Sequence, residues 1–388
     1  MGLAPAFPCI IVGGTNGKGS TCAYLEAILG AAGYKTGLYT SPHLLRYNER
    51  VRIAGMEAGD AELVAAFEKI DAVRGDTSLT YFEFGTLAAM AQFIDAGVEV
   101  AILEVGLGGR LDAVNVFDAE AAIVTSVDLD HMEYLGDTRE KIGFEKAGIF
   151  RAGRPAICAD PTPPASLIQH ARSIGADLRC VERDFSAQRE GNGWCFCGRV
   201  ANWSSLPFPA MVGAYQLRNA AAALAALESV QVRLPVSEAA LRQGLAAAQV
   251  PGRFQRIAGT PEVILDVAHN PEAARALAAT LREQPVPGRT LAVVGMLADK
   301  DAAGVIDALS DEVDAWWACA PESPRARDAA ALAAVLHDHV GGAPVRVQPD
   351  VSEALAEARG AADEGDRILV FGSFYTVAAV LNHAATQQ

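Results

Sequence analysis

The sequence CIIVGGTNGKGS, residues 9–20, decides the fold that we expect for this chain. The apolar run at residues 9–12 has the length of a buried parallel strand, and it stops at Gly13 and Gly14. A glycine-rich turn then passes Lys18 into an apolar-periodic helix at residues 21–32. Such a turn presents backbone N–H groups to a phosphate, and a lysine adds positive charge. The stretch therefore predicts a phosphate-binding loop.

The loop departs from the standard Walker A spacing. That pattern needs a glycine where this chain has Val12 and a Ser or Thr where it has Gly19, so the hydroxyl is delayed to Ser20. The alternative interpretation is a glycine-rich strand-to-helix turn with a surface lysine. The order of strand, glycines, lysine and helix favours phosphate binding.

Composition limits the classes of protein to consider. With 388 residues, 51% of them apolar and 20% charged, the chain is long enough for two domains with sizeable cores. A net charge of −15 argues against nucleic acid and against an anionic membrane surface as partners. The negative net charge does not exclude small molecules such as a nucleotide, because a loop and a few cations determine nucleotide binding locally.

The chain predicts a cytoplasmic location. It has no apolar segment long enough to span a bilayer and no start typical of a signal peptide. Its seven cysteines are odd in number and scattered, which suits free thiols in a reducing compartment. Cys195 and Cys197 would share one face of a strand, and no second pair completes a zinc site.

Strands and helices alternate along most of the chain. Strands are expected at residues 35–39, 98–105, 121–127 and 155–159, with helices at 60–73, 82–96 and 138–150. This alternation predicts an α/β fold with a P-loop-type, mostly parallel sheet. Residues 178–206 read as a small antiparallel patch, and alanine-rich helices follow at 215–230 and 236–249.

Pro251 and Gly252 break this pattern, so we expect domains at 1–250 and 251–388. In the second domain, strands are expected at 262–266, 290–296, 315–320, 345–347 and 367–371, and helices include 271–281 and 351–362. This is a smaller, Rossmann-like α/β domain, although no G-x-G-x-x-G fingerprint occurs in it.

Polar clusters follow several predicted strands of the first domain. They are the phosphate loop, residues 40–43, Glu104 and residues 128–131. Parallel strands would bring them to one sheet edge, where ligands bind. Glu104, with the Ser41 hydroxyl and the His131 nitrogen, is a candidate ligand set for Mg²⁺. Without a metal, Glu104 would simply be a charged residue at the end of a strand. His131 would then be a hydrogen-bonded histidine in a loop.

Other polar residues are less distinctive. Lys146, taken alone, reads as a solvated or salt-bridged lysine, and Lys141 and Glu145 suit a helical ion pair. Arg253 at the domain junction could reach a ligand held between domains. Asp266 ends a strand, and its alternative role is to cap the helix that follows.

Longer motifs along the chain form an ordered set. They are GTNGKGS at 14–20, TSPHL at 40–44, EVGLGGRLDA at 104–113, EKAGIF at 145–150, PGRFQ at 251–255, DVAHNP at 266–271 and GSFYTVA at 372–378. With these motifs the chain resembles the folylpolyglutamate synthase family of the Mur ligase superfamily. The segment SLTYFEFGTL at 78–87 is more like the bifunctional bacterial branch of that family, which is also a dihydrofolate synthase.

The resemblance implies the reaction and the residues. The enzyme would be an ATP-dependent ligase that joins L-glutamate to dihydropteroate and to folates through an acyl phosphate, with ATP and Mg²⁺ as cofactors. The nucleotide residues would be Thr15, Asn16, Gly17, Lys18, Gly19, Ser20, Asn219, Arg253 and Asp266. Ser41, Glu104 and His131 would ligate the metal, and Lys18, Glu104, His131, Lys146 as a carbamate, and His269 would be catalytic. The pterin substrate would contact Thr80, Tyr81, Phe82, Glu83, Leu111, Asp112 and Ala113.

Two further expectations come from the resemblance. The family is commonly monomeric. Its members usually carry a mostly helical segment before the first strand, whereas this chain starts close to that strand, so we expect either that the start is truncated or that the pterin contact of that segment is absent. A Mur-type ligase acting on a UDP-linked substrate is the alternative, and the segments SLTYFEF at 78–84 and GGRLDA at 108–113 argue against it.

Overall fold

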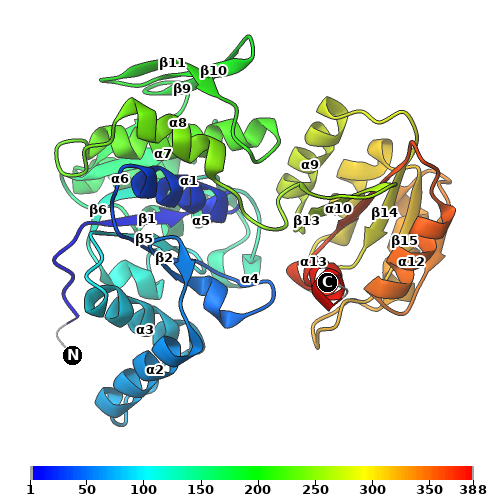
Figure 1. Ribbon diagram of the computed structural model, residues 1–388, viewed down its shortest axis with the longest axis horizontal. Helices are drawn as coiled ribbons and strands as arrows, with labels where there is room; N and C mark the ends of the chain where they lie inside the picture. Colours follow the sequence, from blue (N-terminus) through cyan, green and yellow to red (C-terminus); the bar gives the residue numbers. More distant parts are fainter. Residues whose placement is uncertain (1–2, 387–388) are drawn as a thin grey trace. The chain divides into compact units, whose positions relative to one another are not determined.

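The computed structural model describes residues 3–386 and divides into two compact units (Figure 1). The first comprises Met1–Ala210 and Tyr215–Gln249, and the second comprises Met211–Ala214 and Val250–Gln388. Within the described residues, no helix is both long and apolar enough to cross a membrane.

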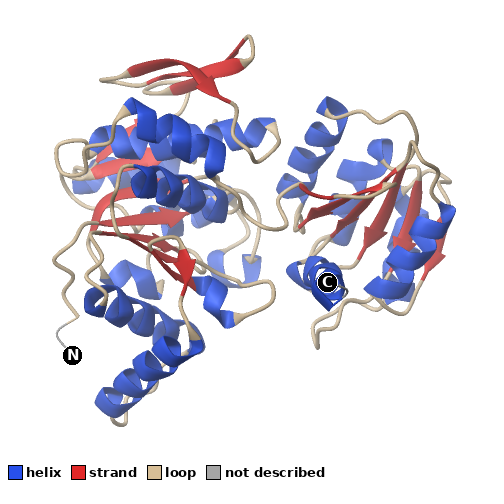
Figure 2. Ribbon diagram, viewed as in Figure 1, coloured by secondary structure: helices blue, strands red, loops and turns tan. Residues whose placement is uncertain are grey.

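An eight-stranded sheet forms the centre of the first unit (Figure 2). Its order is β4-β3-β2-β5-β1-β6-β7-β8, and neighbours from β2 to β8 are parallel. The strands are β1 Cys9–Gly13, β2 Thr36–Tyr39, β3 Val51–Ile53, β4 Met56–Glu57, β5 Val100–Glu104, β6 Ala119–Val124, β7 Pro155–Cys158 and β8 Asp177–Cys180. β1 and β5 are buried along their whole length, which explains their continuous apolar sequence.

Helices cover both faces of this sheet. They are α1 Lys18–Ala31, α2 Asp60–Arg74, α3 Tyr81–Asp95, α4 Met132–Leu135, α5 Arg139–Ala147, α6 Ala165–Ile174, α7 Ala214–Ser229 and α8 Glu238–Ala247, with short 3₁₀ turns at Tyr47–Arg50 and Ala113–Val116. In Figure 1, α1, α7 and α8 lie on one side of the central strands, and α2 and α3 lie on the other. The close fit of α1 on α8 depends on Gly244, because a Cβ there would meet the backbone of Ile28.

A separate antiparallel sheet confirms the predicted patch. It contains β9 Ser186–Glu190, β10 Gly193–Cys197 and β11 Asn202–Pro207. Trp194 and Phe196 are buried, while Cys195 and Cys197 lie on the other face of β10, as their spacing predicts. The expected start of the patch at residue 178 is wrong, because residues 177–180 form β8 at the edge of the large parallel sheet.

The second unit is a smaller doubly wound domain. Its sheet order is β12-β13-β17-β14-β15-β16, parallel except for the β12–β13 pair. The elements are β12 Gln255–Ile257, β13 Glu262–Asp266, α9 Pro271–Glu283, β14 Thr290–Val294, α10 Ala302–Leu309, a 3₁₀ turn Ser310–Glu312, β15 Ala315–Ala318, α11 Ala329–His339, β16 Val345–Val347, α12 Val351–Ala361, β17 Arg367–Phe371 and α13 Phe374–Thr386. The predicted fold class is therefore confirmed.

Candidate active site

The phosphate loop leaves β1 at Gly13 and enters α1 at Lys18. Gly17 has φ +86°, and a Cβ there would lie 2.5 Å from Oδ1 of Asn219 on α7. Gly14 has φ +147° and lies directly against Thr125. A side chain at either position would be strained and would collide, so the two glycines allow the loop to pack closely on β6 and α7.

The segment after β6 holds this loop. The Thr15 N–H donates to the Ser126 carbonyl at 2.8 Å, and the Asn16 N–H donates to Ser126 Oγ at 3.1 Å. Thr125 Oγ1 donates to the Asn16 carbonyl at 2.6 Å, and the Asp128 N–H donates to Thr15 Oγ1 at 3.0 Å. These bonds fix the loop at the carboxyl edge of the sheet.

Lys18 lies at the first position of α1. Its Nζ donates to the carbonyls of Gly14 at 3.0 Å and Thr15 at 3.1 Å, so the ammonium lies inside the loop. A cation at a helix N-terminus surrounded by backbone N–H groups is suited to phosphate oxygens.

Helix α7 supplies partners to the same turn. Ser20 is buried, and its Oγ accepts a hydrogen bond from Gln216 Nε2 at 3.3 Å. Asn219 Nδ2 donates to Gln216 Oε1 at 3.1 Å, next to Gly17. Asn219 was expected at the nucleotide. The positioning role of Gln216 was not expected, although it lies one helical turn before Asn219.

Glu104 ends β5, which is adjacent to both β1 and β2. Its side chain is buried, and the Ser41 N–H donates to Oε2 at 3.0 Å. Both carboxylate oxygens lie 3.9 Å from the Cβ position at Gly19, in the first turn of α1. The structure thus brings Ser41, Glu104 and the phosphate loop together, as the parallel order predicts.

These donors fit a hard divalent cation. Within residues 3–386, no group of three or more His, Cys, Asp and Glu side chains could hold a metal ion. The metal would therefore need the Ser41 hydroxyl and phosphate oxygens beside the Glu104 carboxylate, which is the oxygen-rich set that Mg²⁺ prefers.

His131 follows β6, on the other side of β1 from Glu104. It has φ +50° and precedes α4, and its Nε2 lies 3.9 Å from Asp130 Oδ2. The loop that carries it is held by Arg139, whose Nε donates to the Val127 carbonyl at 2.7 Å, and by Asp160, which accepts the Val127 N–H at 2.7 Å. The position of His131 therefore depends on an ion pair between the partly exposed Arg139 and the buried Asp160.

Lys146 is buried on α5, with 3% of its surface exposed. Its carbonyl lies 2.9 Å from the Cβ position at Gly109, so α5 packs on the loop after β5. The expectation of a solvated lysine is wrong. The expected Lys141–Glu145 pair is also wrong, because Lys141 pairs with Asp137 and Glu145 pairs with Arg110.

Four of the expected substrate residues begin α3. Thr80 and Glu83 form a capping box, in which Glu83 N donates to Thr80 Oγ1 at 3.2 Å and Thr80 N donates to Glu83 Oε2 at 2.7 Å. The hydrogen bonds from Thr80 hold the pKa of the Glu83 carboxyl below its usual value. Phe82 lies 2.7 Å from the Cβ position at Gly106, so it sits under the loop after β5. Tyr81 is exposed.

An arginine between aromatic rings adjoins Tyr81. The Arg50 guanidinium lies 5.3 Å from the Tyr81 ring centre and 5.5 Å from that of Tyr47. Its Nε donates to His43 Nδ1 at 2.9 Å. Burial and the neighbouring Arg50 charge lower the pKa of His43. Tyr47 and Arg50 were not expected at the site, because more than thirty residues separate them from Tyr81 in the sequence.

The other expected substrate residues follow β5. Leu111 is exposed, and Ala113 begins a 3₁₀ turn. Asp112 accepts the N–H groups of Leu107 at 2.9 Å and Val114 at 3.1 Å. Burial raises the pKa of Asp112 despite these bonds. Asp112 therefore shapes the loop whose tip exposes Leu111.

In the second unit, the expected residues gather after β13. Asp266 is buried and accepts the N–H groups of Phe254 and Ala268, each at 2.8 Å. Burial raises the pKa of its carboxyl, and the charge of Arg253 opposes this shift. The helix cap of α9 is Asn270 and not Asp266, since Asn270 accepts the Ala273 N–H.

Arg253 and His269 share an aromatic neighbour. The Arg253 guanidinium lies 5.4 Å from the ring centre of Phe374, and the His269 ring lies 6.1 Å from it. His269 Nδ1 is 2.8 Å from the Val267 carbonyl. This bond directs the Nε2 of His269 away from the backbone.

Known families match both parts of the chain. The family described as Mur ligase middle domain matches residues 12–227, and the one described as Mur ligase, glutamate ligase domain, matches residues 252–374. The dihydrofolate synthase/folylpolyglutamate synthase of Escherichia coli K12 is 48% identical over 382 residues, covering 98% of this chain and 87% of that protein. This chain belongs to the dihydrofolate synthase/folylpolyglutamate synthase family.

Solved structures of dihydrofolate synthase/folylpolyglutamate synthases have the same fold. One E. coli structure, in complex with DHPP and ADP, has a TM-score of 0.94 and 46% identity, covering 99% of this chain and 90% of that one. A bifunctional folylpolyglutamate synthase/dihydrofolate synthase structure with Mn, AMPPNP and L-glutamate bound has a TM-score of 0.91 and 48% identity, covering 100% of this chain and 90% of that one. The predicted enzyme class, an ATP-dependent ligase that joins glutamate to folates, is confirmed, with ATP and a divalent metal as cofactors. The UDP-linked alternative is not favoured.

Proposed function

We propose that this enzyme performs both reactions of the bifunctional branch, joining L-glutamate to dihydropteroate and to folates through an acyl phosphate. The observation that supports this most strongly is the convergence of the phosphate loop, Ser41 and Glu104 at the ends of the adjacent parallel strands β1, β2 and β5.

The chemistry takes two steps. A carboxylate oxygen of the pteroate or folate attacks the γ-phosphorus of ATP, the bond from that phosphorus to the β–γ bridging oxygen breaks, and ADP leaves. The glutamate nitrogen then attacks the acyl carbon, the carbon–oxygen bond to phosphate breaks, and the nitrogen loses a proton. The products are the amide, ADP and phosphate, and positioning with charge stabilisation accounts for most of the catalysis.

The chain's own residues bind and orient the phosphates. Lys18 and the N–H groups at residues 15–20 would hold the phosphate oxygens at the N-terminus of α1. Ser41, Glu104 and His131 would hold Mg²⁺, which supplies positive charge for the phosphates when bound. Lys146, as a carbamate, would provide a further anion near that ion.

Substrate and nucleotide contacts are assigned by resemblance and local geometry. Residues 80–83 and 111–113 would contact the pterin, and the exposed side chains of Tyr81 and Leu111 suit a flat ring. Asn219, Arg253 and Asp266 would contact the nucleotide, and His269 would take part in the reaction. We also propose that the enzyme acts as a cytoplasmic monomer on small molecules alone; the buried free thiols of Cys22 and Cys158 suit a reducing compartment.

A product assay tests the proposal. The purified protein, ATP and Mg²⁺ are supplied with labelled L-glutamate and either dihydropteroate or tetrahydrofolate. We expect label in a dihydrofolate product in the first case and in a diglutamate in the second, with one ADP for each amide. Label with only one acceptor contradicts the dual activity, and ADP formation without glutamate contradicts the ligase mechanism.

A further inference from the structure

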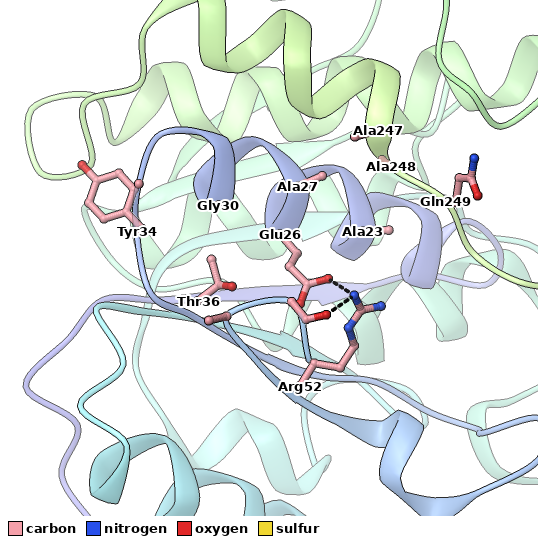
Figure 3. Close-up of a pocket in the computed structure, with 13 residues that line it drawn as sticks. Ala23, Glu26, Ala27, Gly30, Tyr34, Thr36, Arg52, Ala247, Ala248 and Gln249 are labelled. Atoms are coloured by element: carbon pink, nitrogen blue, oxygen red, sulfur yellow. Dashed lines mark hydrogen bonds and ion pairs between the residues drawn. The ribbon is translucent and has the colours of Figure 1, made fainter. Parts of the chain in front are cut away.

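A pocket of about 500 Å³ lies beside the middle of α1, apart from the phosphate loop (Figure 3). Helix α1 forms one wall, the turn between β3 and β4 forms another, and the end of α8 closes the side. Glu26, in the pocket, is eight residues after Lys18, which corresponds to about 12 Å along the helix axis. The volume is within the usual range for small-molecule sites.

Many of the residues that line the pocket are very small. They include Ala23, Ala27 and Gly30 on α1, and Ala247 and Ala248 at the end of α8. A Cβ added at Gly30 would meet no atom within 4 Å, although the glycine is inside a helix where alanine would be more stable. The small side chains therefore leave open space on this side of the pocket, and a small ring can fit there.

An ion pair provides the polar part of the pocket. Glu26, whose side chain is 8% exposed, places Oε2 3.3 Å from Nη2 of Arg52, and Nη2 also donates to the Gly55 carbonyl at 2.8 Å. Figure 3 shows the two side chains facing each other at the pocket. Burial raises the pKa of the Glu26 carboxyl, and the Arg52 charge opposes this shift.

Each member of this pair has one unsatisfied atom. Glu26 Oε1 and Arg52 Nε are buried and have no hydrogen-bond partner among the described residues. A buried carboxylate oxygen without a donor and a buried N–H without an acceptor both cost free energy. A ligand in the pocket that these side chains line could satisfy the oxygen and the N–H group after rotation about Cγ–Cδ of Glu26 and Cδ–Nε of Arg52.

We propose that this pocket is a second small-molecule site, which binds a flat, neutral lactam ring. The ring N–H would donate to the carboxylate of Glu26, and the adjacent carbonyl would accept from the guanidinium of Arg52. A neutral ligand is favoured because the two side-chain charges already compensate each other, and an added ion would leave one charge unpaired.

A pair of simple probes tests the hydrogen-bond pattern. Binding of 2-pyridone, which has the N–H and the carbonyl side by side, is compared with that of N-methyl-2-pyridone by saturation-transfer NMR titration on the full-length protein. We expect saturable binding of 2-pyridone and at least tenfold weaker binding of the methylated ring. No saturable binding, or equal binding of both rings, overturns the proposal.

Two matched glycine variants locate the site. Gly30→Leu fills the pocket from α1, whereas Gly360→Leu adds the same side chain to α12, at another helical glycine with open space around its Cβ position. We expect 2-pyridone binding to fall at least tenfold in Gly30→Leu and to stay unchanged in Gly360→Leu. Unchanged binding in a folded Gly30→Leu places the ligand elsewhere. If that variant fails to fold, loss of binding in Glu26→Gln is the equivalent test.

Competition distinguishes the biological sources of such a ring. Uridine carries the lactam on a nucleoside, and pterin carries it on a fused ring of the substrate class. Displacement of 2-pyridone by one of them from the wild-type protein identifies the source. Failure of both to displace the probe contradicts a role for the pocket in binding a natural lactam.

Discussion

Two carboxylates end buried strands in the two units, Glu104 on β5 and Asp266 on β13, and their surroundings differ. Both are at most 5% exposed. The two oxygens of Asp266 each accept a backbone N–H at 2.8 Å, which ties the strand to the turns around it. Glu104 accepts the N–H of Ser41 and lies against the first turn of α1.

This difference shows that the end of a strand determines the position of a carboxylate, whereas the neighbouring loop determines its role. Next to a glycine-rich turn and a helix N-terminus, a carboxylate can serve a metal and a phosphate. Next to two backbone N–H groups, it stabilises a turn. We therefore expect substitutions at the Glu104 edge to change mainly catalysis, and substitution of Asp266 to change stability in addition to the nucleotide contact proposed for it.

The largest effect is expected from Lys18→Ala and from Glu104→Gln. Each should lower turnover by about 10²–10³-fold, because Lys18→Ala removes positive charge at the transferring phosphoryl group and Glu104→Gln removes the carboxylate proposed to hold the metal ion. Glutamate-dependent ADP release provides the measurement. Lys141→Ala, which removes an exposed lysine paired with Asp137, is the control and should retain full activity. Normal turnover in Lys18→Ala or Glu104→Gln would contradict the assignment of this edge.

Lys146→Arg should lower turnover by about 10–100-fold, the range found for groups that support a metal site. Arginine keeps the positive charge at this buried position but cannot form a carbamate. Mass spectrometry of the intact protein in bicarbonate buffer should show the carbamate mass on the wild type and not on Lys146→Arg. Wild-type activity in the variant would mean that a cation alone is needed there.

Asp266→Asn should lower the free energy of unfolding by about 1–3 kcal/mol, since the amide turns an N–H donor toward a buried backbone donor. Denaturant unfolding followed by circular dichroism measures this. Asp299→Asn, at an exposed ion pair, should change stability by less than about 1 kcal/mol. If Glu104→Gln destabilises the protein as much as Asp266→Asn does, the proposed difference in role between the two carboxylates is wrong.

The smallest expected effect is on the pH dependence of stability, and it comes from His43, two residues after Ser41. Its pKa is lowered from 6.5 by burial and by Arg50, so the unfolded chain binds a proton before the folded protein does. The free energy of unfolding should therefore fall as the pH drops below 6.5, until His43 is protonated in the folded state as well. In His43→Gln this part of the pH dependence should disappear. An identical profile for both proteins would show that His43 has the same pKa folded and unfolded.

The sequence predicts the positions at this edge well because they follow from strand direction. Apolar runs that end in polar clusters identify β1, β5 and β6, and parallel pairing then places Lys18 and Glu104 together. What the sequence does not reveal depends on contacts between distant residues. Glu145 pairs with Arg110 and not with its helical neighbour Lys141, and no local pattern could have indicated this.

Burial and the edges of sheets are two further features that the sequence predicts poorly. Lys146 lies among charged neighbours in sequence, and only the packing of α5 on the loop after β5 buries it. The mixed sequence DLRC of β8 has no strand signature, since an edge strand is half exposed. The β3–β4 hairpin turns at Ala54 and Gly55, which both have positive φ. Alanine is not typical of such a turn, so the sequence does not predict it.

The bonds between the phosphate loop and the segment after β6 have a consequence for binding. Hydrogen bonds with residues 125–128 already order Thr15 and Asn16. A flexible loop would lose conformational entropy when it closes on a phosphate, and that loss would reduce affinity. Here the ordering is completed during folding, so the free energy of phosphate contact is available for nucleotide affinity.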